Sequence, residues 1–180
     1  LAYLFPAFGH RLASDPLVLQ PVTTSWREWS QRCAALATHP GVVESRDFWL
    51  DTVTRATLRV ASQEVPEAPG VDDLVRLSAT LSASETTEID DVRRRLRLPI
   101  DDIMLAALAR TIAVTVGDGA VAVDLSGPGR SVLKPDVDLR RTVGWFTTVY
   151  PVALTCTNGR DTSARQLLDE VADTVKAVPH

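Results

Sequence analysis

The stretch that decides the fold is VAVDLSGPGRSVLKPDVDLRRTVGWFTTVYPVAL, residues 121–154. It begins as an apolar run, breaks at Gly127-Pro128-Gly129 and resumes as TVGWFTTVYPV. Valine, threonine and aromatic residues favour strands, whereas glycine and proline favour turns. We therefore expect two strands, at 120–125 and 143–154, joined by a polar loop that carries Arg130.

This loop contains little chemistry of its own. Between Gly127 and Pro135 it has no histidine, cysteine or carboxylate. Its glycine spacing matches neither a dinucleotide-binding motif nor a phosphate-binding loop, and Pro128 removes an amide that a phosphate site would use. Trp145 and Phe146 are adjacent, so in a strand their side chains point to opposite faces. We expect one of them to enter the core and the other to line a cleft or an interface.

Apolar periodicity and capping residues predict helices on both sides of this hairpin. Ser25 and Ser82 are each followed three residues later by glutamate, which is the pattern of a capping box. The segment LVRLSATLS, residues 74–82, alternates like a strand. The sequence therefore predicts an α+β lobe, a mixed β-sheet covered by helices on one face. The expected helices are a partly helical stretch in 1–13, then 26–36 ended by His39-Pro40-Gly41, Val43–Arg55 with Phe48, Trp49 and Val53 buried, 83–96, 101–117, and Ser163–Val178 capped by Asp161 or Thr162.

Composition excludes several classes of function. The 180 residues are 45% hydrophobic, which suits one domain or one lobe with a real core. A net charge of −4 without a basic stripe argues against a nucleic-acid partner. No apolar run has the length of a membrane span, and neither the three histidines nor the two cysteines have metal-ligand spacing. We expect a cytoplasmic chain with two buried thiols, cut from a larger polypeptide because it begins on Leu1.

Several motifs resemble the condensation superfamily of nonribosomal peptide synthetases, epimerization domains in particular. DLRRTVGWFTTVYPVAL, residues 138–154, is similar to the epimerization motif DLSRTVGWFT…P, and this match is specific. The other similar segments follow in the family's order along essentially the whole chain. They are TTSWREWSQRCAALA at 23–37, RDFWLDTV at 46–53, PIDDIMLAALARTI at 99–112 and KAVPH at 176–180.

The resemblance implies a fold like chloramphenicol acetyltransferase, with two lobes and a tunnel between them. The phosphopantetheine arm of a peptidyl carrier protein would enter this tunnel, and no cofactor would be bound directly. The family's catalytic HHxxxD motif belongs to the N-terminal lobe and does not occur in this sequence. We therefore expect residues 1–180 to be the C-terminal lobe, with the N-terminal lobe and the carrier protein as partners.

The family's EGHGRE loop corresponds here to Ser126-Gly127-Pro128-Gly129-Arg130-Ser131. The glycines and the arginine remain, but both glutamates and the histidine are replaced. Ser126 occupies the position of the candidate proton carrier, and a serine of ordinary acidity cannot be that base. We therefore name no catalytic residue. The residues expected on the tunnel side are Gly127, Gly129, Arg130, Thr142, Trp145 and Thr147.

Several functions stay open from the sequence alone. One is a degenerate X-type domain, as in glycopeptide-antibiotic synthetases, that recruits haem monooxygenases through an exposed surface. Arg93, Arg94 and Arg95 are candidates for that surface, although beside Asp90-Asp91 they also form an ordinary mixed-charge face. The alternatives are an active condensation domain, a stand-alone acyltransferase of the same fold, and an epimerase with another base. For the last we expect no candidate, because Asp124 should point away from the neighbours of Ser126.

Overall fold

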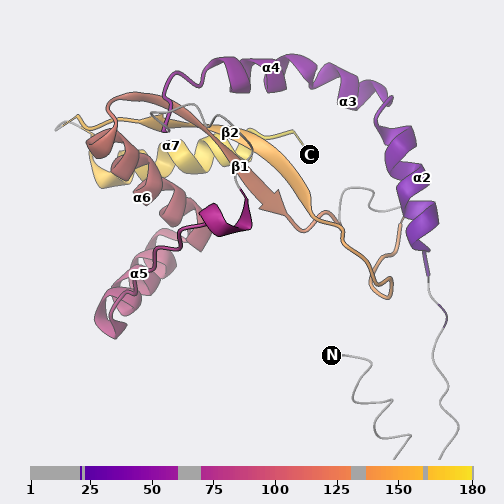
Figure 1. Ribbon diagram of the computed structural model, residues 1–180, viewed down its shortest axis with the longest axis horizontal. Helices are drawn as coiled ribbons and strands as arrows, with labels where there is room; N and C mark the ends of the chain where they lie inside the picture. Colours follow the sequence, from indigo (N-terminus) through magenta and orange to yellow (C-terminus); the bar gives the residue numbers. More distant parts are fainter. Residues whose placement is uncertain (1–20, 22, 61–69, 131–136, 160–161, 180) are drawn as a thin grey trace, which may run out of the picture. The chain divides into compact units, whose positions relative to one another are not determined.

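The computed structural model describes residues 21, 23–60, 70–130, 137–159 and 162–179 (Figure 1). The helical stretch expected within residues 1–13 therefore lies outside the described residues. The chain forms two compact units. Unit 1 is drawn from Leu1–His39 and Pro128–Thr147, and unit 2 from Pro40–Gly127 and Thr148–His180.

Unit 2 is built on an antiparallel pair of strands, β1 (Gly119–Gly127) and β2 (Thr148–Cys156). The pairing is continuous from Gly119 opposite Cys156 to Gly127 opposite Thr148. Side chains alternate between the two faces of a strand, so this register fixes which residues enter the core. The two strands expected from the sequence thus form and pair with each other, which confirms the α+β class.

Two long helices bury one face of this hairpin. They are α6 (Ile100–Thr115) and α7 (Ala164–Lys176), and Figure 1 shows them beside the strands. Gly117, at a φ of 127°, follows α6 as expected, since glycine adopts this conformation without strain. The cap of α7 is Ser163, not Asp161 or Thr162, because its hydroxyl accepts the Gln166 amide. The shared core contains Leu105, Ala109, Ile112, Val121, Val152, Leu154, Cys156, Leu167 and Val171.

The helix expected over Val43–Arg55 is two helices, α3 (Pro40–Glu44) and α4 (Arg46–Thr54). Pro40 ends the preceding helix and starts α3, because proline suits the first position of a helix. The expected burial of Val53 is wrong, since its side chain is 55% exposed. Thr52 is buried instead, and its hydroxyl donates to the Phe48 carbonyl at 2.8 Å.

The expected strand at 74–82 is absent. These residues connect a short 3-10 turn, η1 (Val71–Asp73), to α5 (Ala83–Leu96) without a partner strand among the described residues. Leu74 and Leu77 are 73% and 91% exposed. Alternation favours a strand only where another strand accepts its hydrogen bonds, and here the described chain supplies none. The capping box that starts α5, between Ser82 and Glu85, is confirmed.

Unit 1 has a small aromatic core. The helix α2 (Trp26–Leu36) brings Trp26 and Trp29 against Phe146 edge-to-face, with ring centroids 4.9 and 5.0 Å apart. Edge-to-face packing adds about 0.5–1.5 kcal/mol per pair to ordinary burial. Because Phe146 is drawn into this core, 143–147 are not part of a strand, and the expected strand 143–154 begins only at Thr148. Only half of the expected cap forms: Ser25 accepts the Glu28 amide, but the Glu28 carboxylate binds Arg32 at 2.7 Å.

The two thiols differ in burial. Cys156 is buried in the core of unit 2, as expected, whereas Cys33 on α2 is only half-buried. Both are free, and burial raises the pKa of each thiol above its ordinary value.

Hydrogen bonds join the start of α2 to the chain around Asp138. The Thr24 amide donates to the Asp138 carbonyl at 3.2 Å, and the Asp138 amide donates to the Thr24 hydroxyl at 3.3 Å. The buried Thr142 hydroxyl donates to the Thr24 carbonyl. The Asp138 carboxylate accepts from the Arg140 guanidinium at 3.0 and 2.7 Å and from the Arg140 amide at 3.0 Å. These bonds lower the pKa of Asp138 to about 2.

Gly144 is required by close packing. A Cβ at this position would lie 2.5 and 2.8 Å from ring atoms of Trp26 and 3.3 Å from Phe146. We predict that Gly144→Ala displaces the Trp26 ring and lowers the free energy of unfolding by about 1–3 kcal/mol, as overpacking does. Tryptophan fluorescence during urea unfolding measures this. Gly159→Ala is the control, since its Cβ would meet the Thr162 hydroxyl oxygen at an ordinary 3.5 Å; equal effects of the two substitutions would contradict the packing argument.

The lowered pKa of Asp138 predicts that the free energy of unfolding depends on pH in the acid range. Its folded pKa, about 2, lies below the unfolded value of about 3.9, so the unfolded chain binds more protons between these values. The stabilisation is therefore complete above about pH 4 and is lost as the pH falls through 2. Asp138→Asn should remove this part of the acid sensitivity, measured as the urea midpoint between pH 5 and 2. If wild type and variant lose stability in parallel, the carboxyl does not contribute.

Candidate functional site

The residues expected on the tunnel side fall into both units. Ser126 and Gly127 end β1 in unit 2. Gly129 and Arg130 belong to unit 1, together with the segment that runs from Thr142 to Thr147.

In unit 2, Ser126 and Asp124 are exposed and lie on the same face of β1, because they are two residues apart. Asp124 thus points away from residues 125 and 127, the neighbours of Ser126, as expected, but it shares a face with Ser126 itself. Opposite them on β2 lie Pro151 and Val149. Toward the end of β1 this face therefore presents the Asp124 carboxylate and the Ser126 hydroxyl beside apolar side chains.

Gly127 closes the hairpin at a point with no room for a side chain. A Cβ there would lie 2.8 Å from the Thr148 hydroxyl oxygen, directly across the ladder. The glycine after Ser126 is thus explained by the approach of the two strands.

In unit 1, Arg130 serves the loop itself. Its guanidinium donates to the carbonyls of Leu139 at 2.6 Å and Thr142 at 3.2 Å, and lies 4.2 Å from the centroid of the Phe146 ring. Gly129, buried at a φ of 62°, makes the turn that brings the arginine there. Both hydrogen bonds come from Nη1, so Arg130, although exposed, ties the carbonyls of Leu139 and Thr142 together and packs on the Phe146 ring.

The remaining expected residues divide into buried and exposed. Thr142 is buried and bonded to Thr24, so it too is structural. Trp145 is 82% exposed whereas Phe146 is 3% exposed, which confirms that these neighbours point in opposite directions. Trp145 and the exposed Thr147 are the members of this group that a ligand can reach.

The described loop residues offer no acid or base for proton transfer. In 126–130 and 137–147 the one carboxylate is Asp138, and both of its oxygens accept hydrogen bonds from Arg140. Across the described chain no three histidine, cysteine, aspartate or glutamate side chains gather as a metal site would require. The described part of this loop exposes one indole, Trp145, and one hydroxyl, Thr147, that a ligand could contact.

The arginines expected at a partner surface lie on α5, which has no buried residue. Arg93 pairs with Asp90 at 3.2 Å and Arg94 with Asp91 at 3.6 Å, so both charges are partly compensated within the helix. Arg95 is exposed beside them. The surface is therefore a mixed-charge helix face whose positive end is the last turn of α5.

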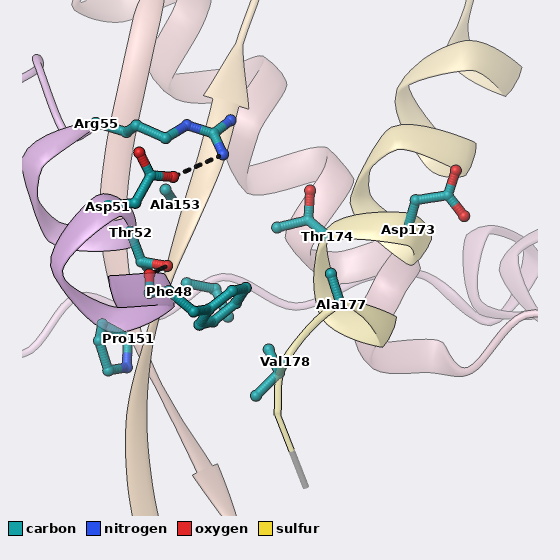
Figure 2. Close-up of a pocket in the computed structure, with 11 residues that line it drawn as sticks. Phe48, Asp51, Thr52, Arg55, Pro151, Ala153, Asp173, Thr174, Ala177 and Val178 are labelled. Carbon is teal, nitrogen blue, oxygen red and sulfur yellow. Dashed lines mark hydrogen bonds and ion pairs between the residues drawn. The ribbon is translucent and has the colours of Figure 1, made fainter. Parts of the chain in front are cut away.

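Two features of unit 2 could not be predicted from local patterns in the sequence. Asp102 in the first turn of α6 is 5% exposed, and burial raises the pKa of its carboxyl, while Lys176 opposes this shift. The other is a hollow of about 280 Å³ between α4, β2 and α7, which we call the slot. Figure 2 shows its lining residues. They are Phe48, Asp51, Thr52, Arg55, Pro151, Val152, Ala153, Asp173, Thr174, Ala177 and Val178.

Sequence reasoning missed the slot because its walls come from three segments that lie far apart in the chain. The one available signal was Pro151 within an expected strand, since proline within a sheet is confined to edges or bulges.

Within the described ranges no helix is long and apolar enough to cross a membrane.

Comparison with known proteins supports the motif assignment. The family model of the Condensation domain matches residues 3–180. The chain is 57% identical over 179 residues to a component of the phenolphthiocerol/phthiocerol polyketide synthase of Mycobacterium tuberculosis, covering 97% of this chain and 12% of that protein. It is 33% identical over 180 residues to a component of the linear gramicidin synthase of Brevibacillus parabrevis, covering 97% of this chain and 3% of that protein.

Among solved structures, the epimerization domain from the third module of tyrocidine synthetase B superposes with a TM-score of 0.72 at 21% identity. The match covers 97% of this chain and 39% of that one. At this identity the likeness establishes the fold, which is the α+β lobe expected from the sequence. Because the family model spans nearly every residue and the solved domain shares the fold, the chain belongs to the condensation-domain family.

Proposed function

We propose that the chain is the C-terminal lobe of a condensation-type domain in a multimodular synthase. In this role it binds an acyl or peptidyl chain on the phosphopantetheine arm of a carrier protein, and it does not carry out epimerase proton transfer. The relatives support the setting, because two of them are components of a polyketide synthase and of a gramicidin synthase. This chain spans only 12% and 3% of their lengths.

The observation that carries the proposal is the replacement of acid–base chemistry by scaffolding in the 126–130 loop. Abstraction of a Cα proton needs a base within hydrogen-bond reach whose pKa suits the task. Ser126 is a hydroxyl, and Arg130 is bound to the carbonyls of Leu139 and Thr142. The loop thus keeps a defined backbone shape without a group that accepts the proton.

Within this role two functions remain candidates. A domain without catalysis would be a platform, and recruitment of a haem monooxygenase to carrier-bound peptide stays a prediction for it. An active condensation domain would take its base from the HHxxxD motif of the N-terminal lobe, outside this sequence. The polyketide synthase relative favours a carrier-bound acyl chain as the ligand in either case.

Proton exchange tests the loss of epimerase chemistry. In D₂O, the full-length protein given an aminoacyl-phosphopantetheine carrier is expected to introduce no deuterium at Cα above the level without the protein, measured by mass spectrometry. An authentic epimerization domain is the positive control. Exchange by the wild-type protein that Ser126→Ala abolishes would overturn the proposal, because it would make the loop an acid–base site.

The arginine surface on α5 makes a separate prediction about the protein partner. If the carrier or another synthase domain docks there, reversing Arg93, Arg94 and Arg95 to glutamate weakens binding at least about tenfold at low salt and flattens its salt dependence. Each single reversal should have a smaller effect. Arg165→Glu is the matched control, since Arg165 is an exposed, paired arginine on α7. Unchanged affinity in the triple variant would exclude this surface.

A further inference from the structure

The loop that follows β2 contains the single asparagine of this sequence. It is Asn158, it is followed directly by Gly159, and both residues are exposed. An asparagine carboxamide can be attacked by the backbone nitrogen of the next residue. Glycine in that position leaves the approach open, because it has no Cβ and its backbone turns freely. The sequence thus places the two groups of this reaction side by side.

Neither reacting group is held by a hydrogen bond in the described part of the chain. The Asn158 carboxamide has no hydrogen-bond partner there, and the Gly159 amide donates to none. The groups on either side are held: the Asn158 amide donates to the Asp118 Oδ1 at 2.6 Å, and the Gly159 carbonyl accepts from the Thr162 amide at 3.2 Å. The loop is therefore anchored around the reacting pair and leaves the pair itself free to approach.

A second pair of this type is protected by the fold. Asp118 is followed by Gly119, and an aspartate before glycine undergoes the same cyclisation. Gly119, however, is the first residue of β1 and is paired with Cys156 in the ladder. A Cβ at this position would lie 2.8 Å from the Leu58 side chain, so the surroundings are also full. Backbone held in this way opens less often than an exposed loop, and the structure therefore selects Asn158 as the reactive residue.

We propose that Asn158 is a site of spontaneous deamidation. The Gly159 nitrogen loses its proton to hydroxide and attacks the Asn158 Cγ. The bond from Cγ to Nδ2 breaks, ammonia leaves, and the side chain closes on the backbone as a succinimide. Water then opens either carbonyl of this ring, which gives aspartate or isoaspartate at position 158. The reaction consumes water, releases ammonia, needs no cofactor and does not depend on the proposed binding function.

The product changes the charge at a contact between the two ends of the hairpin. Asp118 precedes β1 and Asn158 follows β2, and the Asp118 carboxylate holds the Asn158 amide at 2.6 Å. Deamidation adds a second carboxylate beside the first, and like charges repel. In isoaspartate the chain also runs through Cβ, which lengthens the backbone next to this hydrogen bond. The modification therefore weakens the contact that joins residue 118 to the loop.

Mass spectrometry of the full-length protein, kept at mildly alkaline pH, tests whether the site reacts. The reference is a blocked peptide of residues 154–163, in which no fold restrains the pair. We expect Asn158 in the protein to deamidate within about tenfold of the peptide's rate, because local opening of an exposed loop costs little. Methyl transfer from S-adenosylmethionine by an isoaspartyl methyltransferase should detect the isoaspartate. An Asn158 that stays intact in the protein, or reacts more slowly than this limit, would overturn the proposal.

The substitution Gly159→Ala tests the route of attack. A Cβ at position 159 hinders the approach of the nitrogen to the carboxamide, so deamidation should slow at least about tenfold. The fold accommodates this Cβ, which would meet the Thr162 hydroxyl oxygen at an ordinary 3.5 Å. Thr155→Ala is the control, since Thr155 is exposed in the same segment and takes no part in the reaction. An unchanged rate in Gly159→Ala, or an equal loss in Thr155→Ala, would exclude attack by the Gly159 nitrogen.

Hydrogen exchange of the residue-158 amide in the full-length protein, corrected for the intrinsic rate of each sequence, measures the charge effect. Asn158→Asp reproduces the aspartate product. We expect it to lower the protection of this amide at low salt and to lower it less at high salt, where repulsion between exposed charges is screened. In an Asp118→Ser background the same substitution should cause no further loss. No protection in the wild type, or equal protection in wild type and Asn158→Asp, would contradict the weakened contact.

Discussion

The antiparallel register of β1 and β2 is the constraint on which the rest of unit 2 depends. It places Val121, Val152, Leu154 and Cys156 toward α6 and α7, where they form the buried core. The same register places Ala153 on the other face of β2, where it lines the slot. One pairing thus determines which side chains of β2 face α6 and α7 and which face the other way. A shift by one residue would exchange the two faces and expose the core.

In unit 1 the family motif is explained by packing. Gly144 is needed because the Trp26 ring lies against its backbone. Phe146 is needed because its ring packs against both tryptophans of α2. Arg130 binds carbonyls and covers the Phe146 ring. These residues keep the loop in shape whether or not a catalytic group stands at position 126. The residues of the motif thus have structural roles of their own, and resemblance at TVGWFT does not by itself predict epimerase activity.

Much of the fold and part of the candidate site could be predicted from local signals. The capping box at Ser82 and the end of α6 near Gly117 depend on residues close in sequence. The prediction of a strand at 74–82 was wrong because a strand needs a partner strand, and the alternation of side chains in the sequence does not show whether one is present. The predicted start of the second strand at residue 143 was wrong, and the strand begins at Thr148, because the tertiary contacts of Phe146 override the β propensity of 143–147. Local patterns could not predict the hydrogen bond from Arg130 to Leu139 or the slot between α4, β2 and α7. Both depend on contacts between segments that are not adjacent in the sequence.

The segment 74–82 contributes nothing to the core of unit 2 as described. Leu74 and Leu77 are 73% and 91% exposed, and no residue from 74 to 82 is buried. The buried residues come instead from the hairpin and from the two long helices beside it. Because burial of apolar side chains is the main source of stability, the described part of unit 2 is stabilised by the hairpin, α6 and α7, and not by this segment.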